Sequence, residues 1–300
     1  MSKKGVFRLI RVTCYIAVAV VGILLVSRVW HIEDVPVIGN AIATGSKAVE
    51  IMGGTAGEKG DTPCKKGSGY IDAEDAPLGY VYAAYLSPKH TKFSLVKEEN
   101  TVHHDLVNDG IAQRFSLTAG SGRYLATIYE NVTDISYKKV KALKFTADIH
   151  DPTAPYRVSN SVVHYDADMV AIQHAAELTE GLQSPREKAH GIYTWVVQNI
   201  TYDYDMLGAL ESGYVCEVDT TFDTKKGICY DFAVLYAAMC RSQGIPCKVV
   251  SGYADAVEGY HAWNEVYFDG AYHVVDTSTE AQLDEDVFIR GDGYEAVRYD

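Results

Sequence analysis

The sequence lacks the short spacings that commonly bind metal ions. It has six cysteines and ten histidines but no Cys-x-x-Cys pair, no His-x-x-x-His pair and no Asp-x-Asp-x-Asp-Gly loop. Zinc and calcium sites are usually built on such spacings. The adjacent His103 and His104 have no third ligand at metal spacing, so we expect them on a surface strand. We therefore expect no metal and no cofactor.

Positive charge is scarce beyond the first 30 residues. The chain has 27 basic and 40 acidic side chains and a formal net charge of −13, and all charges in its first 30 residues are basic. The remainder is therefore strongly acidic. Such a surface disfavours nucleic acid as a partner and disfavours electrostatic docking on anionic surfaces.

The N-terminus carries a basic leader followed by an apolar run. An uncharged stretch over residues 12–27 follows MSKKGVFRLIR and ends at Arg28. This order is typical of an export signal, and the run approaches the ~20 apolar residues of a membrane span. An Ala-Ile-Ala cleavage sequence at 41–43 lies far from the apolar run. An uncleaved signal anchor over residues 1–30 is thus favoured over a removed signal peptide, and the bulk of the chain is expected outside the cell membrane, or secreted if the signal is cleaved.

Two further segments precede the helical part of the chain. Residues 31–75 are rich in glycine and small side chains and show no persistent period, which predicts a flexible tether. Four alternating runs follow, FSLVKE, IAQRFSLTA, RYLATIYE and VKALKFTADI, separated by turn signals. They predict a small antiparallel β module over residues 76–155, which shows no catalytic constellation and could bind a surface or cell-wall partner.

Helical signals begin near Asp168 and open a domain predicted to span residues 156–300. Ser184 is followed by proline and, at capping-box spacing, by Glu187, which predicts a helix N-terminus. Cys229 then heads a segment whose apolar residues recur at helical spacing. A thiol at a helix N-terminus is favoured as thiolate, and the free N–H groups there can stabilise an oxyanion.

A hairpin is predicted after this helix. Asp269-Gly270 is a strong two-residue turn signal between HAWNEVYF and AYHVVD. In that register Asn264 faces Val275 and His261 faces Ser278, which brings Asp276 within about two residues of His261. A carboxylate there can fix the imidazole tautomer and stabilise the imidazolium. Cys229, His261 and Asp276 are therefore the candidate nucleophile, base and orienter.

The stretch GICYDFAVLYAAMCRSQGIPCKVVSGY, with HAWNEVYFDGAYHVVDTS after it, resembles the transglutaminase-like superfamily. The family pattern is G-x-C near a helix start, G-I-P-x-x-x-V-x-G-Y, H-A-W-N-E-V and a strand that ends in Asp. The resemblance covers roughly residues 165–279, with Asp276-Thr277-Ser278 where the family often has Asp-Pro-Thr. It implies an α+β fold, a papain-like core of N-terminal helices packed on an antiparallel sheet, of a bacterial membrane-anchored type.

The implied chemistry is acyl transfer through a thioester on Cys229. The second oxyanion donor stays open among Tyr202, Tyr204 and Trp195. Attack by a lysine amine would make the protein a transglutaminase, the activity that we expect first. Attack by water would make it a cysteine peptidase or amidase, and a third hypothesis is a non-catalytic surface-binding scaffold.

The other cysteines are expected to be small buried hydrophobes. This applies to Cys216, Cys240 and Cys247. A bridge between Cys240 and Cys247 is geometrically allowed, and their disulfide state stays open.

Overall fold

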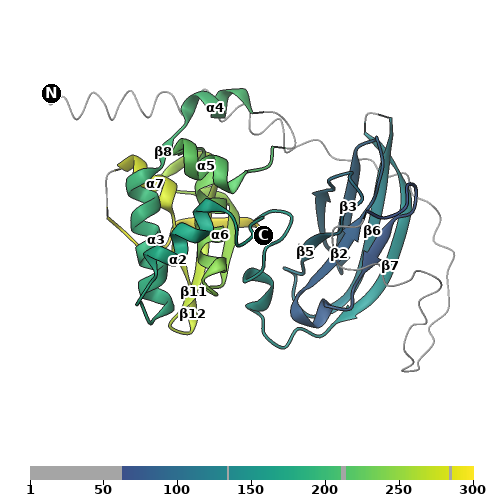
Figure 1. Ribbon diagram of the computed structural model, residues 1–300, viewed down its shortest axis with the longest axis horizontal. Coiled ribbons are helices and arrows are strands. Elements are labelled where there is room, and N and C mark those ends of the chain that lie inside the picture. Colours follow the sequence, from purple (N-terminus) through teal and green to yellow (C-terminus); the bar gives the residue numbers. More distant parts are fainter. Residues whose placement is uncertain (1–62, 134, 211–213, 284–285) are drawn as a thin grey trace.

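A computed structural model describes residues 63–133, 135–210, 214–283 and 286–300. Figure 1 shows two halves side by side, a β module formed by the earlier residues and a mixed half that contains the helices. The expected membrane segment over residues 1–30 and the larger part of the expected tether lie outside the described residues. Within the described ranges, no helix has both the length and the apolar character needed to cross a membrane.

The β module consists of two antiparallel sheets with strand orders β1-β2-β5 and β4-β3-β6-β7. Its strands are β1 (Tyr70–Asp72), β2 (Tyr80–Ala84), β3 (Thr91–Lys97), β4 (Asn100–Asp105), β5 (Gln113–Ser116), β6 (Gly122–Thr133) and β7 (Ser136–Ala147). Both sheets contribute to one core, in which the rings of Phe93 and Phe115 lie 4.5 Å apart. The module is thus a small sandwich, with short 3-10 helices at η1 (Ala76–Leu78) and η2 (Ala154–Tyr156).

The described part of this module has seven strands where the sequence predicted four. The four predicted runs correspond to β3, β5, β6 and β7, so β1, β2 and β4 were not predicted. β1 has three residues, too few to show a period, and it falls in the region assigned to the tether. β4 is polar and half-exposed along its length, so it shows no apolar alternation. Both strands form because their neighbours pair with them.

The mixed half contains six α-helices and a four-stranded antiparallel sheet of order β12-β11-β10-β13 among its described residues. The helices are α2 (Val170–Leu178), α3 (Pro185–Asn199), α4 (Tyr204–Ala209), α5 (Val218–Thr224), α6 (Cys229–Ser242) and α7 (Thr277–Leu283). The strands of the sheet are β10 (Cys247–Ala254), β11 (Val257–Phe268), β12 (Ala271–Val275) and β13 (Tyr294–Tyr299). A parallel pair of two-residue strands, β8 (Thr201–Tyr202) and β9 (Lys226–Gly227), precedes α6.

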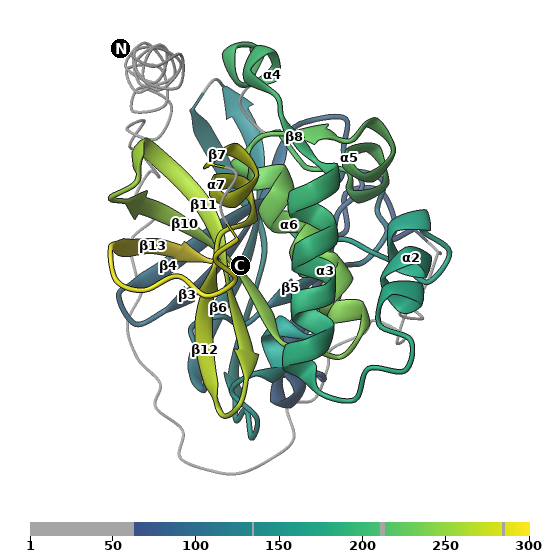
Figure 2. The same ribbon diagram turned by 90° about the vertical axis from the view of Figure 1, so that its left-hand side faces the viewer.

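Helix α6 is the centre of this half. Its side chains from Asp231 to Arg241 are all buried, as expected for a helix that is apolar on every side. Figure 2 shows helices α2, α3 and α5 gathered around it, and strands β10 and β11 pack against its remaining face. The predicted capping box at the start of α3 is confirmed, because Ser184 and Glu187 satisfy each other's backbone N–H groups.

The segment between the halves is fixed to both of them. Arg114 of β5 donates to the carbonyl of Ser159, and its own carbonyl accepts from the N–H of Ser161. At the far end of α6, the buried guanidinium of Arg241 donates to the carbonyls of Val158, Cys247 and Asp300. These bonds satisfy the donors of a buried charge with carbonyl oxygens.

Candidate active site

Cys229 is the first residue of α6, as the sequence predicted. The carboxylate of Asp231 accepts the N–H of Ile228 at 2.9 Å and so caps the helix. Gly227 precedes this turn, and a Cβ at that position would lie 2.6 Å from the Cβ of Asp231, so only glycine fits without a shift. The half-buried thiol is therefore held where the first N–H groups of the helix have no partner within the helix.

His261 lies on β11 opposite Gly252 of β10. Its side chain is only 3% exposed. The indole of Trp263 lies nearly parallel to the imidazole, with ring centroids 6.2 Å apart. The ring is therefore fixed by packing as well as by its polar contacts.

Asp276 follows directly after β12 and is fully buried. The predicted pairing of Asn264 with Val275 is confirmed. The predicted facing of His261 with Ser278 is wrong, because the chain leaves the sheet after Val275 and begins α7 at Thr277. Asp276 caps that helix by accepting the N–H of Thr279 at 3.0 Å.

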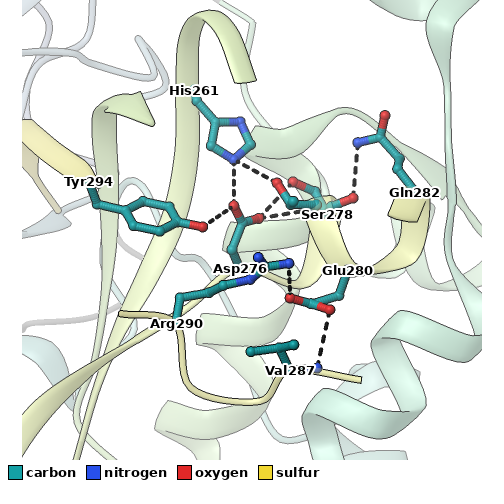
Figure 3. A network of polar contacts seen from close by, with 9 residues as sticks. His261, Asp276, Ser278, Glu280, Gln282, Val287, Arg290 and Tyr294 are labelled. Atoms are coloured by element: carbon teal, nitrogen blue, oxygen red, sulfur yellow. Dashed lines mark hydrogen bonds and ion pairs between the residues drawn. The ribbon is translucent and has the colours of Figure 1, made fainter. Parts of the chain in front are cut away.

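The carboxylate and the imidazole nevertheless meet. Nε2 of His261 lies 2.8 Å from Oδ2 of Asp276, and Figure 3 marks this contact with a dashed line. The side chain of Cys229 also interacts with the imidazole of His261. The hydroxyl of Thr279 also lies 3.5 Å from Nε2. The structure thus brings the three predicted residues together in the order nucleophile, base and orienter.

The electrostatics of this pair favour an imidazolium. Burial opposes the charge of His261, but the carboxylate of Asp276 and the side chain of Cys229 outweigh it and raise the pKa of His261 to about 10. Burial likewise opposes ionisation of Asp276, but His261 and the hydrogen bonds from Thr279 lower its pKa to about 2. Two opposite charges in a shared buried site stabilise one another.

With this geometry established, the chain can be compared with known proteins. Residues 172–277 match the family model of the Transglutaminase-like superfamily. This region of the chain therefore resembles that superfamily. The kyphoscoliosis peptidase of Mus musculus is 30% identical over 114 residues, which cover 34% of this chain and 17% of that protein. The UPF0252 protein MJ1282 of Methanocaldococcus jannaschii is 27% identical over 228 residues, which cover 68% of this chain and 62% of that protein.

A solved structure of a proposed cysteine protease from Cytophaga hutchinsonii is also similar. It is 18% identical, with 74% of each chain covered and a TM-score of 0.39. The chain spans less than two thirds of the length of the curated relatives given above, and only 17% in the case of the mouse peptidase.

The three candidate oxyanion donors occupy different places around the transglutaminase-like region. Trp195 stacks on Phe222 at 4.8 Å, and Nζ of Lys225 lies 4.4 Å above its ring, so Trp195 belongs to a packed cluster. The hydroxyl of Tyr204 donates to Gln282 of α7 at 2.6 Å. Tyr202 pairs with Gly227 across β8 and β9, two residues before the thiol. Of the three, Tyr202 thus lies on the strand paired with the segment that leads into α6.

Two polar residues of the site were missed by the sequence analysis. Asp231, in the first turn of α6, accepts a hydrogen bond from the hydroxyl of Tyr214 at 2.7 Å, and burial raises its pKa. Asp231 lies three residues after Ile228, the spacing at which an acidic side chain caps the start of a helix. This spacing was the sequence signal that could have identified it. Tyr294 of β13 donates to Oδ2 of Asp276 at 3.0 Å. Tyr294 lies beyond the family match, and nothing in the sequence links it with Asp276.

The remaining described cysteines are free thiols, and all but Cys64 are buried. Cys240 and Cys247 interact with each other, and burial followed by this contact raises the pKa of Cys240. Burial, with Asp231 nearby, also raises the pKa of Cys216. Cys216 and Cys240 therefore resist ionisation, and all three buried cysteines fit the predicted role of small core side chains. In the described residues, no three His, Cys, Asp or Glu side chains form a group that could hold a metal ion.

Proposed function

We propose that the protein transfers acyl groups from protein or peptide amides through a thioester on Cys229, as a transglutaminase that acts outside the cell membrane. The observation that carries this proposal is the buried pair of His261 and Asp276 beside the thiol at the head of α6. The pair supplies a proton donor, and the helix start supplies N–H groups for a developing oxyanion.

The proposed reaction has two balanced steps. The thiolate of Cys229 attacks the carboxamide carbon of a glutamine side chain, and the oxyanion forms near the backbone N–H of Cys229 and the β8 strand that carries Tyr202. His261, as imidazolium, gives its proton to the departing nitrogen, so ammonia leaves and a thioester remains. A primary amine then attacks the thioester, His261 takes up the amine proton, and collapse gives an isopeptide bond and the free thiolate.

Asp276 has a supporting role in both steps. It holds the imidazole through Nε2 and balances the imidazolium charge. Because His261 and Asp276 are buried, bulk water reaches the pair poorly, which favours an amine over water in the second step.

Hydrolysis of the same thioester is the second candidate. One relative, similar over 114 residues, is named a peptidase, and water can replace the amine without any change in the residues. The protein would then be a cysteine peptidase or amidase of the same superfamily.

The proposed location outside the membrane and a surface or cell-wall partner of the β module rest on the sequence. The leader and apolar run of residues 1–30 support an anchor, and the acidic remainder supports a protein or peptide substrate rather than nucleic acid.

Full-length protein in detergent should be incubated with a fluorescent primary amine and a glutamine-rich unfolded protein, and the products followed by gel and mass spectrometry. Cys229→Ala is the inactive variant. Cys216→Ala is its matched control, because it removes a buried thiol of the same half that takes no part in the proposed reaction. Fluorescence incorporated by the wild type and Cys216→Ala but not by Cys229→Ala supports the transglutaminase. Fragments without incorporation support the peptidase. Identical behaviour of all three proteins would instead favour a non-catalytic scaffold.

A further inference from the structure

Asp276 has more partners than a simple orienting carboxylate needs. Oδ1 accepts the N–H of Thr279 at 3.0 Å and the hydroxyl of Ser278 at 3.2 Å. Oδ2 accepts from Nε2 of His261 at 2.8 Å and from the hydroxyl of Tyr294 at 3.0 Å. Figure 3 shows the Tyr294 hydroxyl and the imidazole reaching the same oxygen from different directions. Tyr294 therefore shares the one atom through which Asp276 acts on His261.

The position of Tyr294 is fixed by the packing of its ring and by the close approach of its strand to β10. The ring packs on Trp263, with centroids 5.1 Å apart, and Trp263 in turn packs on His261. Gly252 lies between β11 and β13, and a Cβ there would overlap the carbonyl oxygen of Glu295. The absence of a side chain at Gly252 thus lets the strand that carries Tyr294 approach the site.

The segment that leads to Tyr294 is tied back to α7. The fully buried carboxylate of Glu280 forms an ion pair with Arg290 and accepts the N–H of Val287 at 3.2 Å. The backbone of Arg290 donates to the carbonyl of Val274, the last residue but one of β12. Figure 3 shows the contacts of Glu280 with Arg290 and Val287, and together with the bond to Val274 they fix the chain on both sides of the carboxylate of Asp276.

We propose that Tyr294 is a positioning residue that sets the acidity of His261 by sharing Oδ2 of Asp276. The proposal rests on the thiol chemistry of Cys229 proposed above. A hydroxyl that donates to a carboxylate disperses its negative charge and so weakens its hold on a neighbouring imidazolium. Tyr294 thereby keeps His261 able to release its proton to a leaving group, while it holds Oδ2 in line with Nε2.

The hydroxyl can only donate at working pH. Burial and the neighbouring carboxylate of Asp276 raise the pKa of Tyr294, so it keeps its proton. The other groups that face His261 are the thiol of Cys229 from α6 and the hydroxyl of Thr279 from α7. Farther out, Arg290 is balanced by Glu280. Removing the Tyr294 hydroxyl thus concentrates the negative charge of the Asp276 carboxylate on its own oxygens. It does not add or remove a formal charge anywhere around His261.

The test measures the alkylation rate of Cys229 by iodoacetamide between about pH 4 and pH 11, followed on the Cys229 peptide by mass spectrometry. This readout needs no substrate. The variants are Tyr294→Phe and His261→Ala, with Tyr236→Phe as matched control. Tyr236 is a buried tyrosine of α6 whose hydroxyl donates to the carbonyl of Ala189 at 3.1 Å.

In the wild type we expect the alkylation rate of Cys229 to change at high pH as His261 loses its imidazolium proton. This high-pH limb of the pH–rate profile should disappear in His261→Ala. In Tyr294→Phe this limb should move upward by roughly half a pH unit to one unit, because Asp276 then holds the imidazolium more strongly. It should not move in Tyr236→Phe. In an Asp276→Asn background the Tyr294→Phe change should have no further effect, since the two residues act through one oxygen.

Three results would overturn the inference: a wild-type profile equal to that of His261→Ala, an unmoved limb in Tyr294→Phe, or a shift that persists without Asp276. If amines are not incorporated and no fragments form while the limb moves as expected, the proposed function fails and the role of Tyr294 stands. With an active enzyme, Tyr294→Phe should lower kcat about fivefold and leave KM unchanged, the loss of one hydrogen bond that acts on the chemical step.

Discussion

The carboxylate of Asp276 is the point where a single-atom change tests the site most directly. Asp276→Asn keeps the shape of the side chain and its contacts with Ser278 and Thr279 but removes the negative charge beside His261. Without that charge, only the contact with Cys229 opposes burial, which is the largest influence on the imidazole, so we expect the pKa of His261 to fall below its ordinary value of about 6.5. The wild-type value is raised to about 10.

The size of the effect follows from these two values. At pH 7.5 the wild-type imidazole is almost wholly protonated, whereas a group with a pKa of about 6.5 is only about 10% protonated. We therefore expect turnover at pH 7.5 to fall at least about tenfold in Asp276→Asn, with the high-pH limb of the activity moved from near 10 to below about 6.5. His261→Ala should lose more, because it removes the proton donor itself.

The same change should appear in stability. The pKa of His261 in the folded protein is raised, so the ion pair makes its full contribution to the free energy of unfolding below about pH 6.5. This contribution is lost as the pH rises towards 10. The folded pKa of Asp276 is lowered, so its contribution is complete above about pH 3.9 and is lost as the pH falls towards 2. Breaking a buried pair costs about 3–5 kcal/mol, so Asp276→Asn should be least stable relative to the wild type between about pH 4 and 6.5.

Urea unfolding at pH 5.5 and pH 9.5 measures the stability difference, and initial rates across pH measure the limb. The reasoning is refuted if Asp276→Asn keeps the wild-type limb. It is also refuted if its stability deficit is no smaller at pH 9.5 than at pH 5.5.

Other expected effects concern stability alone. Gly252→Ala should cost about 3 kcal/mol in urea unfolding, because the added methyl overlaps the carbonyl of Glu295, and an unchanged midpoint would contradict this. Glu280→Gln should cost about 3 kcal/mol, because Arg290 loses its charged partner, whereas removing both charges together should cost less than the single change. Ser184→Ala should cost about 1 kcal/mol through the lost cap of α3, and thermal unfolding that matches the wild type would show that the cap is not stabilising.

The parts of the site that the sequence predicted depend on local signals. The start of α6 at Cys229 follows from an apolar helical period, and the pairing of Asn264 with Val275 follows from the Asp269-Gly270 turn. Both signals are complete within a few residues of the feature they predict. The predicted facing of His261 with Ser278 failed because it extended the hairpin past its last paired residue.

The parts that escaped prediction depend on contacts between distant segments. Tyr294 reaches Asp276 because β13 pairs with the edge of β10 that does not pair with β11. No local sequence pattern predicts this pairing. The strands β1 and β4 are likewise defined by their partners, since one is very short and the other polar. Periodicity predicts an element that buries its own apolar face, and it fails for elements held by neighbours.

The anchoring of Arg241 has a consequence for how the two halves can be separated. The guanidinium of Arg241 donates to the carbonyl of Val158 and so joins α6 to the segment between the halves. In the same segment, the side chain of Arg114 donates to the carbonyl of Ser159, and the carbonyl of Arg114 accepts from the N–H of Ser161. A protease cut in that segment would therefore disturb hydrogen bonds of both halves at once. Deleting the β module would strip the partners from Ser159 and Ser161 and loosen the far end of the helix whose first residue is Cys229. The two halves are thus a single mechanical unit.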